Sequence, residues 1–156
     1  MCYLTTLITV TTGDSFIHDQ IVGRLRQSGQ LYTSGRRQLV DLLLQHGRPA
    51  SVRDLLKKRT RLTQSSMYRN LVDLERMGIV HKVASGDDHA RYELDEALIG
   101  HHHHLICERC GTISDFEVTP AAERAIEVAL RSASKSARFR LTGHRLDAIG
   151  LCVECK

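Results

Sequence analysis

The sequence predicts an α+β fold built from two parts. Three observations support this: helical periodicity through the first half of the chain, a strand–turn–strand pattern that follows it, and two Cys-x-x-Cys pairs in the second half. Four consecutive histidines stand directly before the first pair. We expect a tail at residues 1–20, a winged helix-turn-helix at 21–96 and a small α/β dimerisation domain with a structural zinc at 97–156.

Four segments of the first half have the periodicity of amphipathic helices. They cover residues 21–27, the stretch from Ser34 to Gly47, residues 52–58 and residues 64–77. The last helix has an apolar stripe at Met67, Leu71 and Leu74, and it leaves Tyr68 and Arg69 on its opposite face. Two consecutive helices joined by a tight turn are typical of a helix-turn-helix. The segments Ile79–Val83 and Ala90–Leu94, with the turn Ser85–Asp88 between them, predict the hairpin called a wing.

The second half predicts a short sheet with one helix. Leu105–Ile106 and Thr112–Phe116 flank the first cysteine pair as strands, and Thr119-Pro120 marks a helix start. The alternation of Phe139 and Leu141 with arginines predicts extended chain, and Leu146–Ile149 predicts a further strand that leads to Cys152. A unit of this size buries too little apolar surface to be stable alone, so we expect it to depend on zinc and on a partner subunit.

Charge and cysteine usage narrow the class of protein. The formal net charge is +4, and residues 22–95 alone hold fourteen Lys/Arg against eight Asp/Glu. A basic half predicts a polyanionic partner such as DNA, although many basic runs are only solvated surfaces. Cysteines in two close pairs are typical of intracellular metal sites, and the N-terminus has no basic start and no bilayer-spanning segment, so we expect a cytoplasmic protein. The fifth cysteine, Cys2, is interpreted as an unpaired thiol on the tail.

The cysteine pairs predict a structural zinc site. Closed zinc sites use four tetrahedral thiolate or imidazole ligands, and Cys107, Cys110, Cys152 and Cys155 provide that set. A redox-active dithiol is the alternative, but it would explain one pair and not two.

The histidine run predicts two further sites. Alternate side chains of a strand point to opposite faces, so His101 and His103 would face one way and His102 and His104 the other. Imidazoles suit several transition metals, and carboxylates elsewhere in the chain would complete each ligand shell. Candidates to complete them are Glu93, Asp95, Glu123 and His144. The alternative is an exposed polar loop that binds no metal.

Several motifs together resemble the ferric uptake regulator (Fur) family over about residues 22–156. They are Ser65–Leu71 in the helix-turn-helix, Arg91–Leu94 at the end of the wing, His101–Gly111, and His144 eight residues before Cys152. The family consists of dimeric, metal-responsive bacterial repressors. The resemblance implies that a metal ion at the hinge fixes two winged helices at the spacing that successive major grooves of operator DNA require.

The resemblance also implies roles for individual residues. The four paired cysteines match the structural zinc ligands, His102 and His104 match the regulatory hinge site, and Glu93 lies where iron-type members place a carboxylate. The residues that match an additional site of the dimerisation domain are His101, His103, Glu123 and His144.

The hinge site departs from the iron-type pattern. Pro49 stands where many iron- and peroxide-type members supply a histidine, whereas His81 stands where zinc-type members place a ligand. The carboxylate could be Glu93 or Asp95, which leaves the regulatory metal open: Zn²⁺, weakly favoured, or Fe²⁺, with Mn²⁺ and Ni²⁺ as further options.

For DNA, the resemblance assigns contacts to the recognition helix. We expect Tyr68 at a thymine methyl or base edge and Arg69 on a phosphate, with Ser65 among the DNA-binding residues and backbone contacts from Arg36, Arg37 and the run Lys57–Arg61. The alternative for Tyr68 is an aromatic side chain that packs between helices. Two alternatives to a repressor are a metal-storage or chaperone protein, which would have no use for a winged helix, and a zinc hydrolase. A hydrolase needs an open coordination position, and a closed four-cysteine site has none. We therefore expect no enzymatic activity.

Overall fold

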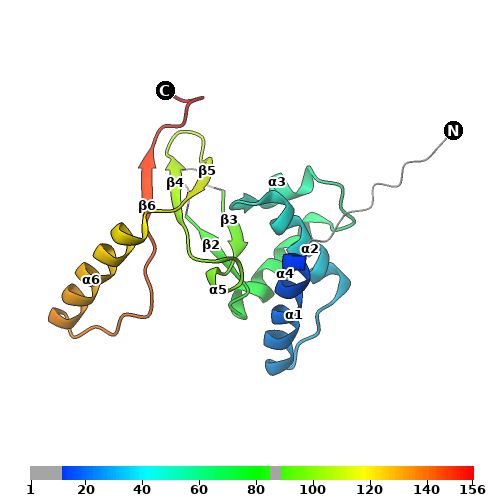
Figure 1. The fold of residues 1–156 in the computed structure, drawn as a ribbon. Coiled ribbons are helices and arrows are strands. Elements are labelled where there is room, and N and C mark those ends of the chain that lie inside the picture. Colours follow the sequence, from blue (N-terminus) through cyan, green and yellow to red (C-terminus); the bar gives the residue numbers. More distant parts are fainter. Residues whose placement is uncertain (1–11, 85–88) are drawn as a thin grey trace. The chain divides into compact units, whose positions relative to one another are not determined.

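The structure is a computed structural model that describes residues 12–84 and 89–156, divided between two compact units (Figure 1). The N-terminal unit runs to Val83 and resumes over Ala90–Gly100. The C-terminal unit takes in His101–Lys156 with Ala84 and His89. The predictions about Cys2 and about the turn at residues 85–88 lie outside the described residues, and the domain boundaries predicted from the sequence stay predictions.

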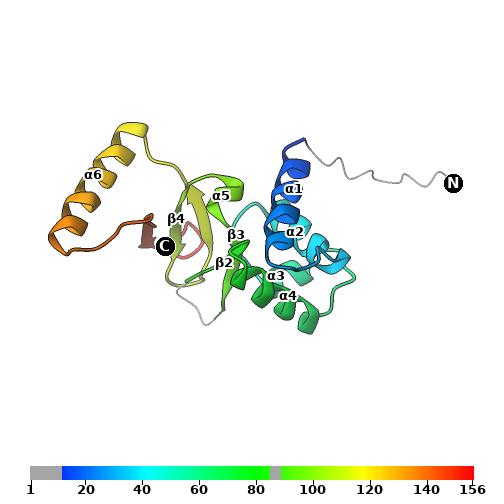
Figure 2. The same cartoon turned by 90° about the horizontal axis from the view of Figure 1, so that it is seen from below.

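The N-terminal unit combines helices with a three-stranded antiparallel sheet (Figures 1 and 2). Its helices are α1 (Thr12–Gln27), α2 (Ser34–His46), α3 (Val52–Leu56), α4 (Gln64–Arg76) and α5 (Glu96–Ile99). Its strands, in the order β1-β3-β2, are β1 (Ala50–Ser51), β3 (Arg91–Leu94) and β2 (Val80–Val83). Helices α3 and α4 form the predicted helix-turn-helix, and β2 with β3 form the predicted wing.

A serine or threonine hydroxyl caps the N-terminus of each of the helices α2, α3 and α4. Thr33 caps α2, one residue before the predicted start at Ser34, and Thr63 caps α4 by accepting the N–H of Ser66. Ser51 and Asp54 form a reciprocal capping box at the start of α3. Burial alone would raise the pKa of Asp54, but hydrogen bonds from Lys57 and Ser51 outweigh it and lower that pKa to about 2. These caps satisfy backbone donors that the first turn leaves unpaired.

The apolar core of the N-terminal unit holds the recognition helix by one face. Met67, Leu71 and Leu74 of α4 are fully buried against Leu39 of α2 and Leu55 of α3, within one cluster of buried side chains. This confirms the predicted stripe. Since one face of α4 supplies the packing, the opposite face is left to contact a partner.

The helix at the N-terminus is longer than predicted. We expected a tail to residue 20, but α1 begins at Thr12, and Ile17, Ile21 and Leu25 pack at four-residue spacing on the core. The apolar stripe is hard to see in the sequence because a histidine, His18, is also buried there. The prediction of a tail over residues 12–20 was therefore wrong.

A tertiary contact explains why a histidine is tolerated in α1. His18 Nε2 donates to Asp41 Oδ1 of α2 at 2.9 Å, and its Nδ1 lies 2.6 Å from the hydroxyl oxygen of Tyr32. Burial raises the pKa of Tyr32, so the hydroxyl keeps its proton and can donate to Nδ1. Both ring nitrogens of His18 thus have a hydrogen-bond partner. These bonds offset the free-energy cost of burying a polar side chain.

The C-terminal unit is a three-stranded sheet with one helix. Its elements are β4 (His103–Cys107), β5 (Ile113–Phe116), α6 (Pro120–Ser136) and β6 (Asp147–Gly150). The sheet order is β5-β4-β6, with β4 antiparallel to β5 and parallel to β6 (Figure 1). Thr119 caps α6 and Pro120 occupies its first turn, as predicted.

The segment before β6 differs from the prediction. Phe139–Leu141 has no regular secondary structure, and Phe139 is 69% exposed. Alternation of apolar and polar residues is compatible with a strand, but a strand also needs a neighbour to pair with. In the described chain β4 already pairs with β5 on one side and with the four residues of β6 on the other.

The C-terminal unit buries few apolar side chains. Ile106, Cys107, Ile113 and Cys155 are buried with the histidines of β4, whereas α6, which is described throughout, buries none of its residues. Such a unit gains little stability from its own core. In neither of the described segments does a helix have the length and apolarity to cross a bilayer.

Candidate metal centres and nucleic-acid interface

Strand register brings the two cysteine pairs together. Cys107 ends β4 beside Gly150 of β6, so the chain that follows each strand carries a Cys-x-x-Cys pair at the same end of the sheet. The four sulfur atoms lie within 4.8 Å of one another, and those of Cys110 and Cys152 are 3.7 Å apart. Sulfurs bound tetrahedrally to zinc at about 2.3 Å would be about 3.8 Å apart. The arrangement of Cys107, Cys110, Cys152 and Cys155 fits a structural zinc.

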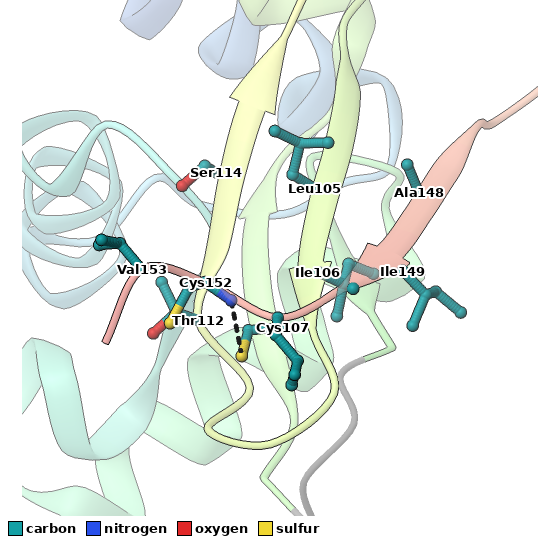
Figure 3. Close-up of a pocket in the computed structure, with 11 residues that line it drawn as sticks. Leu105, Ile106, Cys107, Thr112, Ser114, Ala148, Ile149, Cys152 and Val153 are labelled. Carbon is teal, nitrogen blue, oxygen red and sulfur yellow. Dashed lines mark hydrogen bonds between the residues drawn. The ribbon is translucent and has the colours of Figure 1, made fainter. Parts of the chain in front are cut away.

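Backbone N–H groups favour the thiolate form at Cys107, but burial opposes it at Cys155. The backbone N–H of Cys152 points at Cys107 Sγ, 3.4 Å away (Figure 3), and with the N–H of Cys110 it lowers the pKa of Cys107 to about 6. Burial and the neighbouring sulfurs raise the pKa of Cys155 to about 12. A zinc ion bound here would displace the protons that the thiols of this cluster carry.

An apolar groove adjoins the cysteines on the sheet (Figure 3). Leu105 of β4 is 49% exposed beside it, Ile149 of β6 is 71% exposed, and Val153 is 79% exposed. Exposed apolar side chains gathered in one place are typical of a surface that contacts another protein.

The four histidines alternate between two faces, as predicted. The rings of His101 and His103 lie 4.8 Å apart between centroids, and those of His102 and His104 lie 5.1 Å apart. The alternation persists through His101 and His102 although β4 begins only at His103. The run therefore provides ligands to two separate clusters.

The first cluster unites all four residues of the predicted additional site. Ligand atoms of His101, His103, Glu123 and His144 lie within 4.8 Å of one another. Glu123 accepts from His103 Nε2 at 2.9 Å, which lowers the pKa of the carboxyl. His144 Nε2 is buried 3.1 Å from Glu123 Oε1, outside hydrogen-bond geometry, and it has no hydrogen-bond partner among the described residues. Three imidazoles converging on one carboxylate fit a divalent cation; that they bind one stays a prediction.

The second cluster contains a residue that the sequence reasoning missed. His102, His104 and Asp115 offer ligand atoms within 4.8 Å of one another. Asp115 of β5 pairs directly with His104 of β4 in the antiparallel register. Counting outward from the cysteine knuckle along both predicted strands would have paired these positions. Two imidazoles with one carboxylate are a common ligand set for Fe²⁺, and they also suit zinc.

A second missed residue lies on the other side of β4. Asp147 of β6 is the register partner of His104, and its Oδ1 lies 3.1 Å from His104 Nδ1. The parallel pairing of segments more than forty residues apart has no local sequence signal.

The wing carries the other predicted ligands of the hinge site. His81 of β2 pairs across the sheet with Glu93 of β3, 2.6 Å from Nε2 to Oε1, and Glu93 is buried. Asp95, the alternative carboxylate, instead accepts the N–H of Ala97 at the start of α5 and pairs with Arg24. Asp95 thus caps α5, and the choice between Glu93 and Asp95 as a metal ligand stays a prediction. His81 and Glu93 belong to the N-terminal unit, so their part in a site with the histidines stays a prediction.

The residues of α4 that are predicted to contact DNA are exposed on its surface. Ser65, Tyr68 and Arg69 are exposed on the face opposite the core, with Tyr68 44% exposed. Lys57 is exposed and pairs with Asp54 at 2.8 Å. Arg37 is exposed as well, with its guanidinium carbon 5.2 Å from the ring centre of Tyr32.

Arg36 is an exception among the predicted DNA contacts. It is 7% exposed, donates to the backbone carbonyl of Leu31 at 2.7 Å, and pairs with Asp73 of α4 at 2.9 Å. A guanidinium committed to these acceptors holds α2 against α4 and does not reach a phosphate. The prediction that Arg36 contacts DNA is corrected to a structural role.

Comparison with known proteins agrees with this architecture. The sequence model of the ferric uptake regulator family matches residues 27–149. The peroxide-responsive repressor PerR of Staphylococcus aureus (strain USA300) is 30% identical over 142 residues, which cover 88% of this chain and 90% of the relative. The Vibrio cholerae ferric uptake regulator has a TM-score of 0.68 at 25% identity, covering 85% of this chain and 99% of that structure. The Helicobacter pylori regulator Fur has a TM-score of 0.68 at 26% identity, and the match covers 93% of this chain and 94% of that structure. The chain therefore belongs to the ferric uptake regulator family of metal-responsive transcriptional repressors that bind DNA.

Proposed function

We propose that the chain is a homodimeric repressor that carries zinc at its four cysteines and binds operator DNA when a second, exchangeable metal ion occupies the site of His102, His104 and Asp115. The observation that carries the proposal is the separation of ligand types. One cluster consists of sulfur alone, and another consists of imidazole and carboxylate groups. Sulfur sites of this kind are closed and hold zinc permanently, whereas nitrogen and oxygen ligands suit ions that exchange.

The ligand set leaves more than one ion as corepressor. Two imidazoles and a carboxylate accept Zn²⁺ and Fe²⁺, and Mn²⁺ and Ni²⁺ are weaker options. The carboxylate of Asp115 makes Fe²⁺ a stronger candidate than the sequence suggested. The Helicobacter pylori relative is described as having three functional metal binding sites. We propose the corresponding third site here at His101, His103, Glu123 and His144.

A second copy of the chain would cover the apolar surface of the C-terminal unit. Ile149 and Val153 are exposed beside the cysteines, and Val128 of α6 is 67% exposed. Burying apolar area of this kind contributes about 25 cal/mol per Å². We propose that two such units associate, so that two winged helices act together on the two halves of an operator.

The recognition helix would read DNA through its exposed face. We expect Arg69→Ala to weaken binding about equally across operator sequences and to lower the slope of log affinity against log salt by about one, because Arg69 would neutralise one phosphate. Arg131→Ala removes a charge that is 70% exposed on α6, and it should leave both quantities unchanged. Fluorescence anisotropy with labelled duplex at several salt concentrations measures both. An unchanged salt slope in Arg69→Ala would contradict the phosphate contact.

The test of the function is metal-dependent DNA binding. Protein purified without added metal is analysed for zinc and then titrated with Zn²⁺, Fe²⁺, Mn²⁺ and Ni²⁺ against duplexes selected from a random pool and against DNA upstream of its own gene. We expect about one zinc per chain before titration and a sharp gain in affinity with one added ion. Absence of DNA binding with every ion would instead support the storage or chaperone hypothesis.

A further inference from the structure

The histidine at the centre of the exchangeable site has a partner on each side. His104 lies on the middle strand of its sheet, with Asp115 of β5 opposite it on one side and Asp147 of β6 on the other. Its side chain is 4% exposed, whereas that of Asp147 is 36% exposed. The 3.1 Å contact joins Asp147 Oδ1 to His104 Nδ1. A carboxylate only accepts hydrogen bonds, so the proton of this contact belongs to Nδ1.

We propose that Asp147 is a positioning residue for the exchangeable metal ion. By accepting the Nδ1 proton of His104, it leaves the lone pair of Nε2 available to the ion and holds the ring in one orientation. The ring's tautomer is set by the hydrogen bond of the nitrogen that does not bind the metal. The inference rests on the proposed function, because it takes His104 to be a ligand of that ion.

The fold keeps Asp147 in register. The backbone N–H of His104 donates to the carbonyl of Leu146 at 3.1 Å, and that of Glu108 donates to the carbonyl of Gly150 at 2.9 Å. These two bonds hold β6 on β4 at both ends of the strand. Cys152 follows Gly150 by two residues, so the cysteine cluster anchors the same strand. The carboxylate is therefore supplied by a hydrogen-bonded strand and not by a loop.

The position of Asp147 also suits a residue that accepts a hydrogen bond from a metal ligand but does not itself bind the ion. Asp147 is absent from the set of ligand atoms within 4.8 Å of one another that includes His102, His104 and Asp115. The side chain of Asp147 is 36% exposed, so its carboxylate stays in contact with water. A charged acceptor also makes the imidazole a better donor to a cation than a neutral acceptor would.

The test compares Asp147→Ala with Asp147→Asn in the full chain with zinc in its cysteine cluster. Zn²⁺ is titrated in competition with a chromophoric chelator, and the binding step lost in His102→Ala identifies the exchangeable site. We expect Asp147→Ala to weaken that step by about 10–100-fold. Asp147→Asn should lose less zinc affinity than Asp147→Ala, because the amide oxygen of asparagine still accepts the Nδ1 proton of His104. Glu117→Ala, which removes an exposed carboxylate from the same unit, should bind Zn²⁺ like the wild type.

A second readout follows the tautomer itself. Long-range ¹H–¹⁵N spectra of histidine-labelled protein, recorded before Zn²⁺ is added at about pH 8, where an unperturbed imidazole is neutral, show which ring nitrogen carries the proton. The signal of His104 is assigned by its absence from His104→Ala. We expect Nδ1–H in the wild type and in Asp147→Asn, and a shift toward Nε2–H in Asp147→Ala.

The two readouts separate the inference from the proposed function. Wild-type zinc affinity in Asp147→Ala, or weaker affinity with an unchanged tautomer, would overturn the positioning role of Asp147. If the tautomer changes as expected but no binding step depends on His102, the positioning role stands and the proposed regulatory site fails.

Discussion

Replacing Cys107 with serine is expected to release one zinc ion per chain and to unfold or dissociate the C-terminal unit. This unit buries few apolar side chains, and α6 buries none in the described chain. In small zinc domains the free energy of metal binding, about 10–16 kcal/mol, supplies the stability of the fold. Serine keeps the size of the side chain but provides no thiolate. The zinc content of purified protein, its molar mass in solution and its circular dichroism measure the effect.

The matched control is Cys2→Ser, the same chemical change at the cysteine that belongs to neither pair. It should retain zinc and the dimer. The N-terminal unit has a separate apolar core, so its helical signal should survive in Cys107→Ser. A Cys107→Ser protein that stays a zinc-loaded, folded dimer would show that the sulfur cluster is not the structural site.

Replacing His102 with alanine is expected to abolish most of the metal-induced gain in DNA affinity while leaving the cysteine zinc and the dimer intact. Coupling free energies between an effector site and a ligand site are typically 1–3 kcal/mol, or about 5–150-fold in affinity. Without His102 the exchangeable site loses one of its two imidazoles. The metal ion then binds too weakly to shift the protein toward its DNA-binding state. Operator affinity is measured with and without saturating metal in both proteins.

His101→Ala provides the contrast because it lies one residue away and serves the other cluster. Its ring contacts His103 and His144, and its Nε2 lies 3.3 Å from Glu123. We expect this variant to keep most of the metal-induced gain in DNA affinity. If His101→Ala and His102→Ala behave alike, the two clusters do not act separately, and the assignment of the exchangeable site to one face of the histidine run is wrong.

Much of the local structure was predictable because its causes are local. A threonine followed by proline begins α6, a capping serine begins α3, and the stripe of Met67, Leu71 and Leu74 orients α4. The two-residue period of an extended chain also assigned the four adjacent histidines to two faces. His144 and Glu123 lie in the predicted cluster; the residues had marked both as candidate ligands, and the resemblance to the family had assigned them to this cluster.

The errors share one cause, which is that contacts between distant segments, present or missing, cannot be read from the local sequence. The start of α1 was missed because His18 interrupts its apolar stripe, and only Tyr32 and Asp41 make that burial tolerable. Arg36 was predicted to contact the DNA backbone, yet it is buried and pairs with Asp73 of α4. Phe139–Leu141 alternates like a strand but has no partner strand in the described chain.

The sequence by itself determined which types of metal-ligating side chain the chain contains and which face of α4 is polar, because residue identity and short-range periodicity specify both. Only the tertiary structure placed Asp115 and Asp147 beside His104. Asp115 and Asp147 flank His104 only through an antiparallel and a parallel strand pairing, and strand register depends on hydrogen bonds between segments that no local pattern connects.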